Sequence, residues 1–144
     1  MNDYLVAESV VLDYEKGYQV GEPVTRNTMQ TRTLRYAHDC VNLGLQFQKT
    51  KLGYHLQNQL IRSSTSVAAN YRAANLAHST AAFAAKLSIV IEEADESTFW
   101  LEFARDKGVI QSETTNKLIK EGQELTAIFV ASRKTIQNNL LKNK

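Results

Sequence analysis

The chain has 144 residues, of which 43% are hydrophobic and 22% are charged, and its formal net charge is +2. These values are typical of one globular domain, and no apolar run approaches the roughly 20 residues that a membrane-spanning helix needs. Because Cys40 is the single cysteine, an internal disulfide and a cysteine-rich zinc site are excluded. We therefore expect a reduced, cytoplasmic protein without a secretory signal.

The small net charge conceals a strong segregation of charge along the chain. Residues 1–25 carry five acids and one base, and residues 26–91 carry eight bases and one acid. Residues 92–113 carry seven acids and two bases, whereas residues 114–144 carry six bases and two acids. This alternation is typical of helices that attract one another, within a bundle or between subunits, but it also fits a basic face for nucleic acid.

The first 25 residues predict an arm that is separate from the rest. Val10, Leu12 and Tyr14 alternate with neighbours that include two acids, and "EKG" and "YQV" follow. This pattern is typical of a small β-hairpin. The only proline, Pro23, lies close to Gly21 and divides the arm, residues 1–25, from a helical domain, residues 26–144.

From about Thr28 the apolar residues follow the period of a helix. Tyr36, Cys40, Leu43 and Phe47 form one stripe, and Leu34, Ala37, Val41 and Leu45 form a second stripe beside it. The combined face is wider than one neighbouring helix can cover. We expect this helix to end in "QKTKLG", with Gly53 as its terminator.

Three more helices are predicted by apolar or small residues spaced three and four apart. The second carries Leu56, Leu60, Ser64, Val67, Tyr71 and Ala74; the third carries Phe83, Leu87, Val90, Ala94, Ser97, Leu101 and Ala104; the fourth carries Leu118, Gly122, Leu125, Phe129, Ser132, Ile136 and Leu140. We expect Ser79 to cap the third helix, Gly108 to end it, and the fourth to start near Ser112. Short connections then predict an all-α, antiparallel up-down-up-down four-helix bundle.

The stretch "SSTSVAANYRAANLAHST", residues 63–80, begins in the second helix. Its small side chains predict a close approach of two helix backbones, with Ala68 at the edge of that contact. A flexible linker is excluded, because a linker would not keep Val67, Tyr71 and Ala74 in helical register.

Catalytic and metal motifs are not found. The acidic run "EEADE" lies beside the third helix's stripe, and none of His38, His55 and His78 follows a glutamate by three positions, as di-iron bundles require. Cys40 lies on an apolar stripe, which predicts a buried, inert thiol. Neither a phosphate loop nor a Gly-x-Ser-x-Gly motif occurs. We expect no enzyme, no cofactor and no metal.

The region from Val41 to Ile91 has no acid, so its bases are candidates for nucleic-acid binding. The candidates are Lys49, Lys51, Arg62, Arg72 and Lys86. The alternative is a structural or inter-subunit ion-pair face with Glu92, Glu93, Glu96 and Glu102, which we favour for Arg72 because it adjoins Tyr71. Phe99 and Trp100 flank the third helix's stripe and are expected to cover a subunit contact, since no alternating aromatic and basic residues surround them.

Three blocks, "QLIRSSTSVAANYRAA", "FAAKLSIVIEEADESTFWLE" and "AIFVASRKT", occur in this order. Together they resemble the small four-helix-bundle proteins encoded in intervening sequences of bacterial large-subunit ribosomal RNA genes, from about Arg32 to Ile136. The resemblance implies an up-down fold, a ring-like homopentamer and no established enzymatic activity. Its motif positions here are Arg62, Ser66, Asn70, Arg72, Glu92, Glu93, Glu96 and Glu102.

Two departures from the resemblance concern the helix start and the arm. Ala82 stands where an acidic residue would complete a capping box, so the third helix should begin more weakly. The arm, residues 1–25, lies outside the resemblance.

The combined expectation is a non-enzymatic homo-oligomer that associates with RNA, DNA or a ribonucleoprotein. The family is similar in architecture to accessory proteins of diversity-generating retroelements, so a reverse transcriptase is an alternative partner. A third possibility is a purely structural scaffold that binds a protein through the arm.

Overall fold

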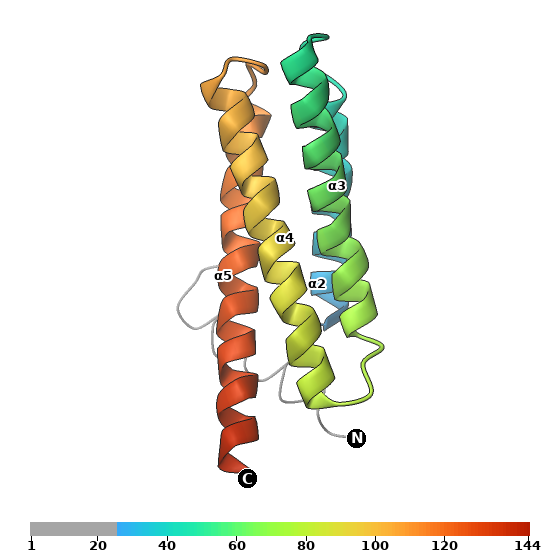
Figure 1. The fold of residues 1–144 in the computed structure, drawn as a ribbon, viewed down its shortest axis with the longest axis vertical. Coiled ribbons are helices and arrows are strands. Elements are labelled where there is room, and N and C mark those ends of the chain that lie inside the picture. The colour runs from blue at the N-terminus through green and yellow to red at the C-terminus, as the bar shows by residue number, and fades with distance from the viewer. Residues whose placement is uncertain (1–25) are drawn as a thin grey trace.

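Four helices make up residues 26–144, the part of the chain that the computed structural model describes (Figure 1). They are α2 (Arg26–Gly44), α3 (Lys51–Ala74), α4 (Thr80–Asp106) and α5 (Glu113–Lys142). The described residues contain no strand, so the expected all-α class is confirmed for them. The predicted β-hairpin falls on residues 1–25, outside the described residues.

Hydroxyl side chains begin the last three helices. Ser79 Oγ accepts a hydrogen bond from the backbone N of Ala82 at 3.1 Å, which confirms the predicted cap of α4. Thr50 caps α3 and Ser112 caps α5 in the same way. At the other end of α4, Gly108 has a φ of +67°, the left-handed conformation that glycine adopts without steric cost.

The predicted end of the first helix is wrong. α2 ends at Gly44, and Gly53 lies instead in the first turn of α3. A Cβ on Gly53 would lie 1.8 Å from the carbonyl oxygen of Gln48, so glycine is needed here because the turn passes close to the helix. Phe47 is buried, as its stripe predicted, but it belongs to the turn rather than to the helix.

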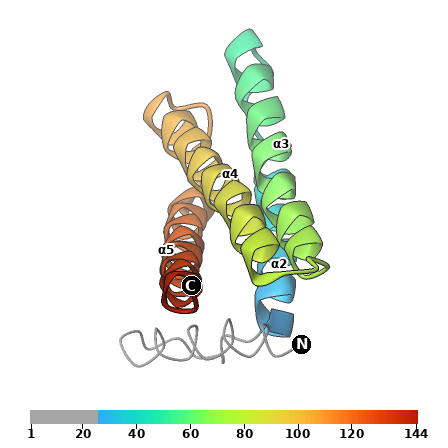
Figure 2. The same ribbon diagram turned by 60° about the horizontal axis from the view of Figure 1, so that its bottom comes forward.

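Hydrogen bonds connect neighbouring segments at both ends of the bundle. The backbone N of Gln48 donates to the carbonyl oxygen of Val109 at 3.2 Å, which joins the turn after α2 to the turn after α4. At the opposite end, Arg26 Nε donates to Asn75 Oδ1 at 2.8 Å and ties the start of α2 to the end of α3. α4 packs against both α3 and α5, while α2 packs mainly on α3 and only slightly on α5 (Figures 1 and 2).

The core follows the predicted stripes. Every residue in the predicted stripes of α3 and α4 is buried, and in α5 only Leu140 is half-exposed. The second stripe predicted for the first helix is only partly buried. Ala37 is buried, but Leu34 in α2 and Leu45 in the turn after it are 52% and 53% exposed. The prediction that this face exceeds what the bundle covers is therefore confirmed. Among residues 26–144, every helix is too short or too polar to cross a lipid bilayer.

Candidate interaction surfaces

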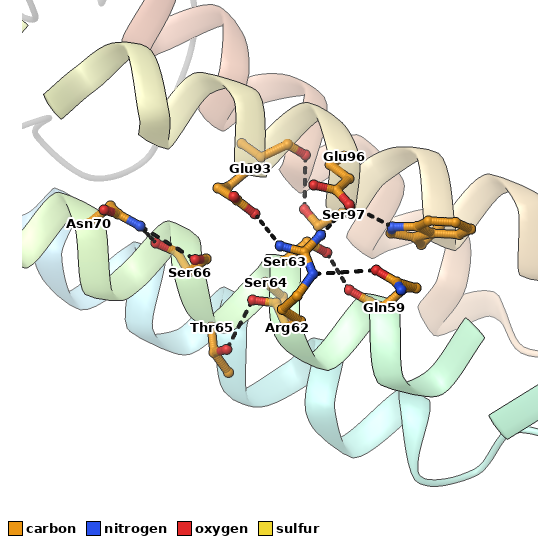
Figure 3. A network of polar contacts seen from close by, with 12 residues as sticks. Gln59, Arg62, Ser63, Ser64, Thr65, Ser66, Asn70, Glu93, Glu96 and Ser97 are labelled. Atoms are coloured by element: carbon orange, nitrogen blue, oxygen red, sulfur yellow. Dashed lines mark hydrogen bonds and ion pairs between the residues drawn. The ribbon is translucent and has the colours of Figure 1, made fainter. Parts of the chain in front are cut away.

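Arg62 joins α3 to α4 through two carboxylates (Figure 3). Its Nη1 donates to Glu93 Oε2 at 3.2 Å, and its Nη2 makes a second ion pair with Glu96. Arg62 therefore makes the ion pair that was predicted as the alternative to nucleic-acid binding. The basic region and the acidic region that the sequence separates thus attract each other here, between α3 and α4.

The same network fixes Glu96 and the Trp100 ring. The hydrogen bond from Arg62 is the main reason that the pKa of Glu96 is lowered from its ordinary value. Trp100 Nε1 also donates to Glu96 Oε1, at 3.2 Å, and lowers that pKa further. The indole is thus held in one orientation against α4.

The polar side chains of the small-residue stretch are satisfied locally. Ser63 Oγ donates to the carbonyl oxygen of Gln59 at 2.8 Å, and Thr65 Oγ1 donates to that of Ile61 at 2.7 Å. Asn70 Nδ2 donates to the carbonyl oxygen of Ser66 at 2.9 Å (Figure 3). These groups bond to their own helix, as Ser, Thr and Asn do within helices, and do not form a polar surface that reads a ligand.

Burial makes Cys40 poorly suited to act as a nucleophile. Its exposed fraction is 0%, and burial raises the pKa of its thiol to about 12. The reactive form is the thiolate, which is therefore scarce at neutral pH. Within residues 26–144, no three His, Cys, Asp or Glu side chains gather closely enough to hold a metal ion.

A salt bridge that the sequence did not reveal closes the contact between α2 and α5. Arg32 Nε lies 2.5 Å from Glu121 Oε1, and its Nη2 lies 2.8 Å from both Glu121 Oε2 and Glu124 Oε2. This bidentate geometry is the strong form of an arginine–carboxylate pair. Glu121 and Glu124 are the only acids after residue 113. Their position in a basic segment is the only feature of the sequence that pointed to a special role for them.

The five predicted nucleic-acid candidates do not form one surface. Lys49 lies just before α3 and Lys51 is its first residue, whereas Arg72 lies near its end, about 32 Å from Lys51 at 1.5 Å per residue. Lys86 lies on α4, and Arg62 is engaged by its two carboxylates. Within residues 26–144, the Arg72 side chain has no hydrogen bond or ion pair, so the ion pair expected for it is not made inside this part of the chain.

Three aromatic rings form a ridge on the outer side of α4, which we call the α4 ridge: Phe99, Trp100 and Phe103. The Phe99 ring centroid lies 4.8 Å from that of Trp100 and 5.8 Å from that of Phe103. Phe99 is 49% exposed. The sequence pointed to the first two rings and missed Phe103.

A histidine and a lysine lie beside the rings of the α4 ridge. His55 of α3 meets the Trp100 ring edge-on at 5.7 Å, and Lys107 Nζ lies 5.8 Å above the Phe103 ring. Lys107 follows Phe103 by four positions, whereas His55 lies 45 residues before Trp100, so no local pattern contains His55.

The second surface is a groove between α2 and α3 with a volume of about 560 Å³. We call it the α2–α3 groove; it is lined by Gln30, Leu34, Ala37, His38, Val41, Thr65, Ala68, Ala69 and Arg72. The half-exposed Leu34 and the alanines of α3 thus share one concave apolar surface. The sequence predicted that Ala68 lies at the edge of a close contact between two helices. In the structure Ala68 lines this groove instead.

Comparison with known proteins identifies a family and a similar solved structure. The family model described as 23S rRNA-intervening sequence protein matches residues 26–131. The fold is similar to the crystal structure of a protein of unknown function from the S23 ribosomal protein family of Bacteroides thetaiotaomicron, with 29% sequence identity and a TM-score of 0.69. That match covers 76% of this chain and 97% of the other. Among curated proteins, none matches the chain.

Proposed function

The chain belongs to the 23S rRNA-intervening sequence protein family, and we propose that it is a cytoplasmic, non-enzymatic, up-down-up-down bundle that assembles with copies of itself into a closed ring. Five copies is the number that the family resemblance implies. The proposal concerns association, because it rests on exposed apolar surface.

The observation that carries the proposal is the uncovered apolar face of α2. Leu34 lies on α2, and Leu45 lies in the turn that directly follows it. Each is more than half exposed, and Leu34 continues into the α2–α3 groove. Exposed apolar side chains beside an apolar groove are typical of an interaction site.

Sedimentation equilibrium tests the proposal over a dilution series of the full chain. We expect a mass several times that of one chain, which persists at about micromolar concentration. A mass of one chain throughout this range would overturn the proposal.

A second candidate function is association with RNA. It is favoured by lysines at the end of the bundle where the turn after α2 meets the turn after α4. Lys49, Lys51 and Lys107 lie there, and none has an ion-pair partner within residues 26–144. Lys49 Nζ lies 5.9 Å above the half-exposed ring of Tyr54, and Lys107 Nζ lies above Phe103. Cations beside exposed rings are the usual components of single-strand binding.

Fluorescence anisotropy with a labelled single-stranded RNA tests this candidate. We expect the affinity to fall steeply as salt rises, because lysine–phosphate contacts release counterions. Lys49→Glu combined with Lys107→Glu should weaken binding, whereas Lys134→Glu, on the exposed side of α5, should not. Equal RNA affinities for the wild type, the double variant and Lys134→Glu would contradict this candidate function. The role beside a reverse transcriptase and the scaffold role of the arm stay predictions.

A further inference from the structure

We propose that the α4 ridge of one copy inserts into the α2–α3 groove of the next copy. This inference rests on the proposed self-assembly and names the two surfaces that make it. None of the ridge residues lines the groove of its own chain, and the occupant that we propose is a second copy, because the charges beside the two surfaces are complementary.

The α4 ridge is a partly exposed apolar surface made of rings that contact one another. Phe99 lies at its crest with half of its surface exposed, and it rests on the rings of Trp100 and Phe103. Trp100 is itself fixed by its hydrogen bond to Glu96 and by the edge of His55. A ring that is already held in place loses little conformational entropy when a partner covers it.

The α2–α3 groove has the shape to receive such a ridge. Ala37, Ala68 and Ala69 are among the small residues that line it, and small side chains leave room for a neighbour's ring to approach the helix backbones. Leu34 and Val41 supply apolar surface from α2. Its volume of about 560 Å³ lies in the range of concave binding sites, about 300–1,000 Å³.

The charges beside the two surfaces are complementary. Asp95 and Glu102 lie one helical turn from Phe99, on its own side of α4, and within residues 26–144 neither makes an ion pair. Arg72 lies in the groove, one turn from Ala68 and Ala69, and also has no ion pair in these residues. Docking brings Arg72 of one copy to the acids of the next, so the ion pair predicted for Arg72 forms between copies.

Because the ridge and the groove are different surfaces, each copy uses one as a donor and the other as an acceptor. Such a head-to-tail contact leaves both a free ridge and a free groove on any open assembly, and only a closed ring satisfies all of them. In a closed ring every copy uses its ridge on one neighbour and its groove on the other, so the contact fits the proposed assembly.

The test uses three variants of the full chain, each with one new carboxylate. Ala69→Glu blocks the groove, Phe99→Glu removes the crest of the ridge, and Val130→Glu places the same charge at a 39% exposed apolar residue of α5 as the control. Circular dichroism and thermal unfolding establish that each variant is folded. The molar mass of each is then measured by light scattering, alone and in a one-to-one mixture of the first two.

The expected result is a ring for the wild type and for Val130→Glu, and a monomer for each of the other variants alone. In the mixture, the intact ridge of Ala69→Glu docks into the intact groove of Phe99→Glu, so the mass becomes that of a dimer and no larger. Such rescue also excludes misfolding as the cause of the monomers.

Failure of this inference is distinguishable from failure of the proposed function. If the wild type assembles and either variant alone still forms rings, or the mixture stays monomeric, self-assembly stands and this pair of surfaces is wrong. If the wild type is itself a monomer, both are wrong.

Discussion

The hydroxyl of Tyr36 on α2 lies 2.7 Å from the hydroxyl of Ser97 on α4, inside the bundle. Ser97 Oγ donates to the carbonyl oxygen of Ala94 at 2.8 Å, so Tyr36 is the donor to Ser97. Gly122 of α5 meets this pair: a Cβ there would lie 2.8 Å from the Tyr36 hydroxyl oxygen and 2.3 Å from Thr98 Oγ1. Three helices thus approach one another at a single polar crossing.

Gly122→Ala should therefore destabilise the fold. Overpacking at such a site costs about 1–3 kcal/mol, which exceeds the gain of about 1 kcal/mol that alanine brings to a helix. Urea unfolding at fixed protein concentration measures the difference. The matched control is Gly44→Ala, whose Cβ would meet Leu60 at an ordinary 3.7 Å and should be neutral or stabilising. Equal effects of the two changes would contradict the crossing.

The thiol of Cys40 should react with an aromatic disulfide reagent only when the bundle opens. Burial raises its pKa to about 12, so at pH 8 the native thiol is both inaccessible and protonated. We expect a rate that increases with urea in parallel with unfolding. In a Cys40→Ser background, a cysteine at the exposed Asn138 should react at once. Immediate reaction of Cys40 in the native wild type would show that the position is open.

Glu96→Gln should remove a stabilisation that depends on pH. The pKa of Glu96 is lowered in the folded state, chiefly by Arg62, so the carboxylate stabilises the fold above its unfolded pKa and ceases to do so as pH falls through the folded value. The effect at pH 7 should be small, within about 1 kcal/mol, because the pair is on the surface. Urea midpoints should differ between wild type and variant at pH 7 and converge only as the pH falls below the lowered pKa of Glu96 in the folded state. A difference that is constant with pH would exclude this origin.

How much of this could be predicted from the sequence depends on the range of each interaction. The buried stripes of α3 and α4 follow from spacing within one helix, so Leu60, Val67 and Leu101 were assigned correctly. The end of α2 was missed because Phe47 keeps the helical spacing of its stripe while it lies in the turn.

The candidate surfaces were predicted less well, because they combine residues from different helices. Arg32 and Glu121 are 89 positions apart, and their pairing depends on how α2 and α5 rotate about their axes. Likewise, the rotation of α3 and α4 about their axes places His55 beside Trp100 and makes Arg62, rather than Arg72, the partner of Glu96. The α2–α3 groove arises where two predicted helices leave space between them, which no single pattern contains.

Two leucine substitutions separate the enclosed part of α3 from its open part. Ser64→Leu should cost about 1–3 kcal/mol by overpacking, because Ser64 is fully buried. Ala68→Leu should change the free energy of unfolding by less than about 0.5 kcal/mol, because its side chain enters the groove. Both are measured by urea unfolding in the Phe99→Glu background, which removes the contribution of assembly. The reverse order of costs would place Ala68 in a closed contact.

Native mass spectrometry of the wild-type chain tests the central claim, closed self-assembly, most directly. The account predicts one dominant species with a fixed number of chains greater than two, five by the family resemblance, and no growth of that number as concentration rises. A monomer at micromolar concentration, or a ladder of ever larger species, would contradict it.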